Sequence, residues 1–268
     1  MVMRANFRDL VGGLIYPIVF RQLLSNVGFP WAIRTVGFLV LATYVLSLWP
    51  ILFYKPQKSP KARSWIDVSA FTDLPFLLAT FGALVGSMGY YLPILFLPLF
   101  AETGIPGFKN TDLAFYLVSI ANAASIFGRL LAGLLATVIG PIETCMLALA
   151  TSSLLLFCWM AVNSTVGIIV WSTIWGLVSG AIVAMPGAMV PLLSPSLAVI
   201  GTRTGMYWVG ASFGILIGGP IAGALVDDRS TDIHWRYLQV FAGVLMAAGA
   251  LSYIYPVISV RSKRTASL

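Results

Sequence analysis

The stretch Leu74–Ala101, LPFLLATFGALVGSMGYYLPILFLPLFA, contains no Asp, Glu, Lys or Arg in 28 consecutive positions. About 20 apolar residues are enough for a helix to cross the hydrocarbon core of a bilayer. Thr144–Thr202 continues the pattern with 59 uncharged positions. In the whole chain, 59% of the residues are apolar, 9% are charged, and the mean hydropathy is +0.93. A soluble domain carries about 25% charged residues, so the sequence predicts an all-α membrane protein with several spans.

Eight spans are expected from the apolar stretches and the turn residues between them. They cover approximately residues 10–25, 32–54, 74–100, 113–137, 142–162, 165–193, 203–226 and 236–258. The first is marginal because Arg21 interrupts it. We divide the chain into two helices at 1–54, a basic cytoplasmic linker at 55–72, a six-helix bundle at 73–260 and a tail at 261–268. Because proline lacks the N–H that a helix needs, five prolines are expected to break or kink their helices: Pro93, Pro98, Pro186, Pro191 and Pro220.

The basic residues favour one side of the membrane. With eight spans, ten Lys and Arg residues fall on the side that holds both termini and the linker, and five lie on or border the other side. Cytoplasmic loops carry the excess of positive residues, so the termini and the linker are expected in the cytoplasm. This bias also accounts for the net charge of +7 without nucleic acid as a partner. The expected surroundings are the lipid bilayer.

Residues for enzyme chemistry or a resident cofactor are sparse. His234 is the only histidine, and all nine acidic residues lie at span ends or in loops. Cys145 and Cys158 lie in one apolar stretch, about 20 Å apart along a helix, which is too far for a disulfide. We therefore expect no enzyme, no metal site and no cofactor. The beginning of the chain also lacks the pattern of a cleaved signal peptide.

Arg129 lies inside the span at 113–137, where a cation costs at least about 2.5–3.5 kcal/mol. Asn122 and Ser125 precede it by seven and four positions, which places all three on one helix face. A guanidinium can hold a planar carboxylate through two parallel hydrogen bonds. We therefore expect these residues to bind an anionic organic solute. The alternative is a structural arginine that reaches the cytoplasmic interface or binds loop carbonyl groups.

Small and aromatic residues also recur at mid-span. Glycines four positions apart, which let helix backbones approach closely, occur as Gly82 and Gly86, Gly176 and Gly180, and Gly210, Gly214 and Gly218. They serve either static packing or helix movement during transport. Mid-span aromatic residues, Tyr90 and Trp175 among them, are candidates to line an aqueous cavity, although core packing or lipid contact is the commoner role.

A short internal repeat favours a transporter. ASIFGRLLAG at 124–133 resembles ASFGILIG at 211–218, three spans later. Each copy lies in the middle span of a group of three. Inverted three-helix repeats are typical of secondary transporters, although the packing of small residues can produce so short a match by chance.

Several stretches together carry a family resemblance. GRLLAGLLATVIG at 128–140 is similar to the loop signature between helices 8 and 9 of the major facilitator superfamily. YLVSIANAASIFGR at 116–129 resembles helix 8 of the monocarboxylate transporter-like proteins of filamentous fungi. GFPWAIR at 28–34 resembles their helix 5–6 turn, and GTRTGM at 201–206 with GGPIAG at 218–223 resembles their helix 11. The resemblance implies a major facilitator fold of which this chain holds helices 5 to 12, without helices 1 to 4.

The resemblance also assigns roles to single residues. Arg129 matches the substrate arginine of that family. Together with the glycine spacing, it assigns gating or packing to Gly128, Gly133, Gly140, Arg203, Gly214 and Gly218. Two positions depart from the pattern, because Thr137 stands where the loop signature usually has an acid and Ser125 where animal monocarboxylate carriers have an aspartate. The family suggests a proton as the coupling ion, whereas the missing acid at position 125 speaks against proton symport.

The expected function is secondary active transport of a small organic solute, anionic and monocarboxylate-like, by alternating access. Its expected binding residues are Arg129, Asn122, Ser125, Tyr90 and Trp175. The plasma membrane is expected rather than the vacuole. The alternative is a truncated fragment that does not transport, or that pairs with another polypeptide. A membrane-embedded enzyme is disfavoured, because no acids or histidines cluster at membrane depth.

Overall fold

The computed structural model describes residues 20, 22–24, 26, 28–53, 64–108, 111–226 and 235–266 of the chain. Every regular element within these ranges is a helix, which confirms the prediction of an all-α protein. The elements are α2 (Phe29–Leu52), the 3-10 helix η1 (Val68–Phe71), α3 (Leu74–Gly104), α4 (Thr111–Ile139), α5 (Pro141–Trp159), α6 (Thr165–Ala184), α7 (Pro186–Leu192), α8 (Ile200–Val226), α9 (Trp235–Ser252) and α10 (Ile254–Ala266).

Seven segments in the described ranges are long and apolar enough to cross a membrane. They cover residues 29–48, 74–104, 112–139, 141–159, 165–192, 200–226 and 235–262. These are the last seven of the eight expected spans, and the chain is therefore an integral membrane protein. The first expected span, at 10–25, lies mostly outside the described residues.

Two spans are interrupted beside a proline. The span at 165–192 changes from α6 to α7 at Met185, directly before Pro186, and the last span changes from α9 to α10 at Tyr253, three residues before Pro256. Each proline removes one N–H donor from the helix. No such interruption occurs at the prolines inside α3, α7 and α8, so the helices are not broken there: Pro93, Pro98, Pro191 and Pro220. One missing hydrogen bond leaves the rest of a long, laterally packed helix intact.

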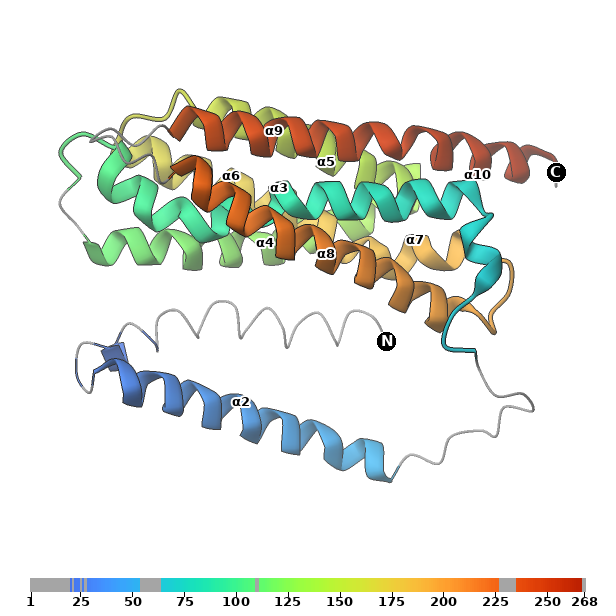
Figure 1. Cartoon of the computed structure of the whole chain (residues 1–268), viewed down its shortest axis with the longest axis horizontal. Helices are drawn as coiled ribbons and strands as arrows, with labels where there is room; N and C mark the ends of the chain where they lie inside the picture. Colours follow the sequence, from blue (N-terminus) through green and yellow to red (C-terminus); the bar gives the residue numbers. More distant parts are fainter. Residues whose placement is uncertain are drawn as a thin grey trace.

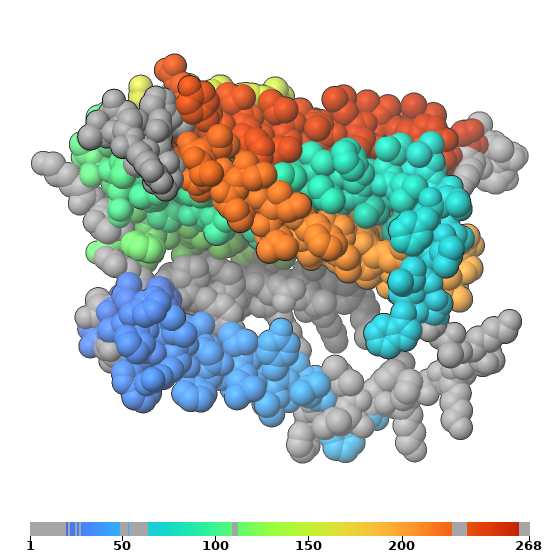
Figure 2. Space-filling view, viewed as in Figure 1, coloured from blue at the N-terminus to red at the C-terminus, as the bar shows by residue number. Residues whose placement is uncertain are grey.

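The helices α3 to α10 form one bundle, and α2 lies to one side of it (Figure 1). The most extensive pairings join α4 with α6 and α3 with α8, while α9 packs on both α3 and α5. Figure 2 shows α3, α8 and α9 side by side on the face in view. If the group α3, α4 and α5 is exchanged with the group α6–α7, α8 and α9–α10, the α4–α6 pair becomes the α8–α3 pair. The two most extensive pairings thus agree with the internal repeat.

Glycines bring the backbones of these two pairs close together. A Cβ atom added at Gly128 would overlap the Leu177 carbonyl oxygen of α6, and one at Gly214 would overlap the Leu84 carbonyl oxygen of α3. The other glycines that face partner backbone in these two crossings are Gly176, Gly180 and Gly218. Small residues at the crossing points are what helices need to associate closely within lipid.

Two further glycines of the expected signature have different surroundings. Gly133 lies on α4, and an added Cβ atom would meet no atom within 4 Å. Gly140 makes the turn between α4 and α5 with a φ of +106°, a backbone conformation that residues other than glycine rarely adopt. Its carbonyl oxygen accepts the Thr144 amide hydrogen, the first helical bond of α5.

Alanine at Gly128 is expected to destabilise the bundle, and alanine at Gly133 serves as the matched control. The Gly128→Ala methyl group would have to displace the α6 backbone, and overpacking of this kind costs about 1–3 kcal/mol or more. Gly133→Ala meets open space and gains helix propensity of up to about 1 kcal/mol. The midpoint of thermal unfolding in detergent measures both changes. Equal midpoints for the two variants would contradict the close α4–α6 approach.

Aromatic rings fill the bundle between α3, α5, α6 and α9. The Trp159 and Trp171 rings stack at 4.8 Å, and the Trp171 and Trp175 rings stack at 5.6 Å. Phe100 of α3 packs edge-on against Trp159 and Trp235, with ring centroids 5.1 and 5.2 Å apart. This column of rings fixes Trp175 at its end, where α6 faces α3 and α4.

Candidate solute site between the helices

Tyr90 of α3 is the centre of the candidate site. With Asn122 of α4 and with Trp175 and Ser179 of α6, it lines a small cavity of about 10 Å³. The Tyr90 and Trp175 ring centroids lie 6.3 Å apart. Three of the five residues expected to bind solute therefore meet in one place, although they come from three different helices.

Arg129 follows Asn122 by seven positions on α4, which places it about two helical turns closer to Gly140. Its side chain is half-buried, and its backbone nitrogen lies against Gly180 of α6. The Nε atom of Arg129 is buried and has no hydrogen-bond partner among the described residues, and the same holds for Nε1 of Trp175. Two buried donors, one on Trp175 beside Tyr90 and one on Arg129 of α4, thus lack an acceptor. A bound anion could supply one.

Ser125 contributes less to this site than expected. Its hydroxyl donates a hydrogen bond of 2.7 Å to the Asn122 carbonyl oxygen of the same helix, and the residue is only 6% exposed. A serine inside a helix commonly bonds to the preceding turn in this way. The Ser125 backbone packs instead on Gly180 of α6. The side chain therefore supports the α4–α6 crossing, and its donor is already in use.

A larger cavity adjoins this site. We call it the tyrosine cavity, because Tyr90, Tyr91, Tyr207 and Tyr253 line it together with Trp208 and Cys145. Its volume is about 50 Å³, counted as the space that the centre of a water molecule can occupy. The Tyr207 and Tyr253 hydroxyls lie 3.0 Å apart and share a hydrogen bond. Sequence reasoning missed Tyr253 and read Cys145 as a packing residue. Pro256 could have indicated Tyr253, because the last span changes from α9 to α10 at Tyr253, three residues before this proline.

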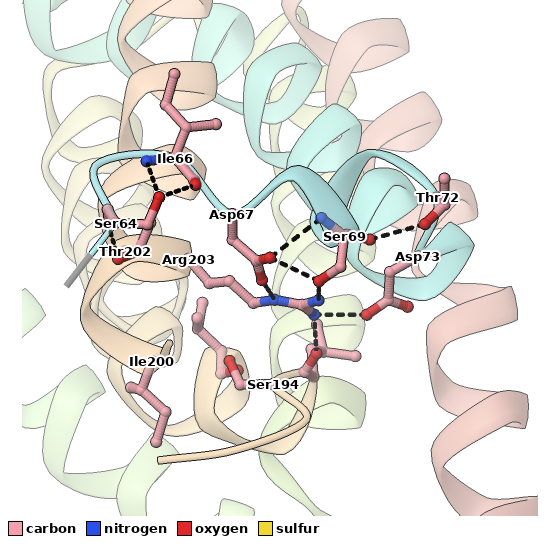
Figure 3. A network of polar contacts seen from close by, with 12 residues as sticks. Ser64, Ile66, Asp67, Ser69, Thr72, Asp73, Ser194, Ile200, Thr202 and Arg203 are labelled. Carbon is pink, nitrogen blue, oxygen red and sulfur yellow. Dashed lines mark hydrogen bonds and ion pairs between the residues drawn. The ribbon is translucent and has the colours of Figure 1, made fainter. Parts of the chain in front are cut away.

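Arg203 forms the densest polar network of the described residues, at the end of the bundle where η1 meets α8 (Figure 3). Its Nε donates to Asp67 at 2.8 Å, and one terminal nitrogen donates to Asp73 at 2.5 Å. The same nitrogen also donates to the Leu193 carbonyl oxygen at 2.6 Å, and the other reaches the Ser69 hydroxyl at 3.3 Å. Arg203 is 1% exposed. It ties the start of α8 to the α7–α8 turn and to the segment before α3.

Sequence reasoning placed Arg203 among the gating or packing residues but did not find its partners. Asp67 and Asp73 are the residues that directly precede η1 and α3, which is the usual place for an acid at a helix N-terminus. That position was the available signal. The Thr202 hydroxyl also donates to the Ser64 carbonyl oxygen at 2.8 Å, so the first turn of α8 holds the segment 64–73 at two places.

The Asp67 carboxylate should make stability depend on pH in the acidic range. The hydrogen bonds from Ser69 and then from Arg203 lower the pKa of Asp67 below its ordinary 3.8. A lowered pKa adds stability that is present above pH 3.8 and is lost as the pH falls through the lowered value. Asp67→Asn is therefore expected to reduce the unfolding temperature at pH 7, with a gap to the parent that closes in strong acid. A gap independent of pH would contradict the ionised hydrogen bonds.

The chain is similar in sequence to several fungal transporters. The chain is 37% identical over 238 residues to the MFS-type transporter dbaD of Emericella nidulans, which covers 87% of this chain and 52% of that protein. It is 33% identical over 246 residues to the aspyridones efflux protein apdF of the same fungus, covering 91% of this chain and 48% of the relative. It is 34% identical over 245 residues to the fujikurins efflux protein of Gibberella fujikuroi, covering 90% and 51%. No protein-family model matches the chain.

The chain spans about half the length of the curated relatives that it matches. Their names are those of transporters and efflux proteins, which confirms the expectation that the chain is not an enzyme. None of the three names specifies a monocarboxylate, so that part of the resemblance stays a prediction. The chain is thus an all-helical membrane protein that is similar, over about nine tenths of its length, to MFS-type transporters of fungi.

Proposed function

We propose that the chain forms part of a secondary transporter that moves a small organic anion by alternating access, with Arg129 holding the anionic group. The observation that carries the proposal is the buried Nε of Arg129, which has no acceptor among the described residues. A buried donor without a partner costs about 1–3 kcal/mol, and a bound carboxylate would remove that cost. Trp175 offers a second such donor in the same region.

The direction of transport that we propose is export. Two relatives are named efflux proteins, one for aspyridones and one for fujikurins, and these names support the movement of an organic molecule out of the cell. Export to the medium requires a place in the plasma membrane rather than in the vacuole. The proposed solute is an organic acid, because Arg129 is expected to bind a carboxylate group.

The second candidate is a fragment that binds solute without transporting it, or that acts as a partner of another polypeptide. The described residues contain one helix bundle and the single helix α2 beside it. Alternating access needs two bundles that rock about one site. The single bundle of the described residues is the observation that favours this candidate.

Exchange of a labelled carboxylate across proteoliposomes separates the two candidates. Purified chain is reconstituted with unlabelled 3-phenylpropionate inside, and uptake of the labelled acid is followed with and without a proton gradient. Saturable exchange that depends on Arg129 supports the transporter. Saturable binding to the chain without exchange supports the second candidate. Neither binding nor exchange would contradict both.

A further inference from the structure

The segment that leads into α3 has its charged residues inside and its apolar residues outside. Asp67 and Asp73 both bond to Arg203, which is buried. The large apolar side chains around them are exposed, and Figure 3 shows Ile66 pointing away from the network. A surface that faces water has the opposite arrangement. We call these exposed residues the apolar rim: Trp65, Ile66, Val68, Phe71, Leu74, and Leu197 of the α7–α8 turn.

Hydrogen bonds hold the rim in this arrangement. The Asp67 carboxylate accepts the Ser69 amide hydrogen at 3.1 Å and the Ser69 hydroxyl at 2.6 Å. The bonds from Arg203, and the bond from the Thr202 hydroxyl to the Ser64 carbonyl oxygen, tie the same segment to α8. Because these polar groups have partners inside the protein, the segment presents its apolar side chains outward as part of its folded structure.

The lengths of α8 and α3 place the rim at the depth of the lipid headgroups. With α8 centred in the bilayer, Arg203 precedes the middle residue Phe213 by ten positions, or about 15 Å along the helix. The hydrocarbon core ends about 15 Å from the bilayer middle, and the headgroup layer ends at about 20–22 Å. The same count from Gly89, the middle of α3, places Leu74 about 22 Å out. The rim lies between these two residues in depth, where tryptophan is enriched in membrane proteins.

The charges at this end of the chain favour anionic headgroups. Three acids here pair with arginines of α8 and α10: Asp67, Asp73 and Glu143. The stretch 55–64, directly before the rim, has four basic residues and no acid, and the stretch 261–268 has three basic residues and no acid. Clusters of about four to eight Lys and Arg beside a membrane span attract lipids with negative headgroups. The rim therefore combines an apolar surface with an excess of positive charge.

We propose that the apolar rim is a lipid-binding surface, and that its occupant is the headgroup layer of the bilayer with a preference for anionic phospholipids. The rim side chains gain apolar burial among the upper parts of the acyl chains, and the basic stretches beside them attract the negative headgroups. Because the rim is bonded to Arg203, the bound lipid also stabilises the start of α8. This inference does not depend on solute binding at Arg129.

Fluorophores at two exposed valines test the proposal. Val68 belongs to the rim and is 76% exposed, whereas Val166, 71% exposed, lies in the first turn of α6 at the opposite end of the bundle. Each is replaced by cysteine in a Cys158→Ser background, since Cys145 is buried, and the purified full chain is labelled with bimane. The background without an added cysteine measures unspecific labelling, and the midpoint of thermal unfolding shows that the variants are folded.

The labelled chains are placed in phosphatidylcholine nanodiscs with an equal, small share of one of two quenching lipids. These are phosphatidylcholine and phosphatidylglycerol that carry a nitroxide near the headgroup end of one acyl chain. At Val68, the phosphatidylglycerol nitroxide is expected to quench at least about twofold more strongly than the phosphatidylcholine nitroxide. At Val166, the two lipids should quench equally. The excess at Val68 should fall at high salt, which screens charges, and in the double variant Lys263→Gln, Arg264→Gln at the end of α10.

Equal quenching by the two lipids at Val68 would overturn the preference for anionic lipid. Weak quenching by both at Val68, with strong quenching at Val166, would place the rim outside the lipid. That result would overturn the proposal and favour a protein partner for this surface instead.

Discussion

Replacement of Arg203 by alanine is expected to lower the free energy of unfolding by about 3 kcal/mol, the lower end of the range for breaking a buried ion pair. The guanidinium is 1% exposed and donates to two carboxylates, a hydroxyl and a backbone carbonyl. Without it, Asp67 and Asp73 face each other as two negative charges, and the Leu193 carbonyl loses a donor. The lower end applies because the Asp73 side chain is 26% exposed and keeps some hydration.

The position of Arg203 makes the two acids more important. It lies in the first turn of α8, where the helix dipole disfavours a cation. Asp67 and Asp73 reverse this local effect, and the Phe76 ring lies 5.1 Å from the guanidinium carbon and covers one face of the group. A lysine could keep the charge but not the four simultaneous contacts. Arg203→Lys should therefore fall between the parent and Arg203→Ala.

Thermal unfolding in detergent measures the effect, and Arg261 supplies the control. Arg261 donates to Glu143 at 2.8 Å, but its side chain is 65% exposed. Exposed ion pairs contribute at most about 1 kcal/mol. For a chain of this size, about 3 kcal/mol corresponds to a fall of roughly 6–12 °C in the unfolding midpoint. If Arg203→Ala and Arg261→Ala lowered the midpoint equally, the buried network would not have the structural weight that its geometry indicates.

The spans and their order could be predicted from the sequence because lipid imposes one strong rule. Stretches such as Leu74–Ala101 must be helical, since every backbone polar group has to be satisfied inside the span. The close approach at Gly214 followed from glycine spacing, whereas the role of Gly128 in packing followed from the family resemblance. The positions at which the helices are interrupted could not be predicted from proline alone. Pro186 adjoins one, whereas Pro93 lies within a continuous helix.

The partners in the site could not be predicted, because they come from distant parts of the chain. Periodicity places Asn122 and Arg129 on one face of α4, but it does not show which helix that face meets. The contact between Tyr90 and Trp175 joins residues 85 positions apart, and the Arg203–Asp67 pair joins residues 136 apart. For Ser125 the helix face was predicted, but the hydrogen bond of its hydroxyl was not. Its spacing suited a solute ligand, whereas a bond to its own helix uses the hydroxyl.

Replacement of Arg129 by lysine is expected to remove most solute binding, although the charge is kept. An ammonium cannot reproduce the planar fork that holds both oxygens of a carboxylate. Loss of one charge-assisted hydrogen bond costs about 1.5–3 kcal/mol, which is roughly a tenfold to hundredfold fall in affinity. Labelled 3-phenylpropionate binding to the purified chain measures this fall. Arg34→Lys is the matched control, because Arg34 is an exposed arginine near the start of α2 that packs over Trp31.

Arg129→Ala separates this role from a structural one. Removal of a charge from the middle of a span relieves a cost of at least about 2.5–3.5 kcal/mol, so the alanine variant should insert and fold at least as well as the parent. It should also bind no carboxylate. A structural arginine that reaches the cytoplasmic interface predicts the opposite pairing, with lysine tolerated and alanine poorly expressed. Expression and binding measured side by side for both variants decide between the two roles. A lysine variant with the affinity of the parent would rule out Arg129 as the bidentate holder of the anion, because the ammonium would then be doing the same task through charge alone.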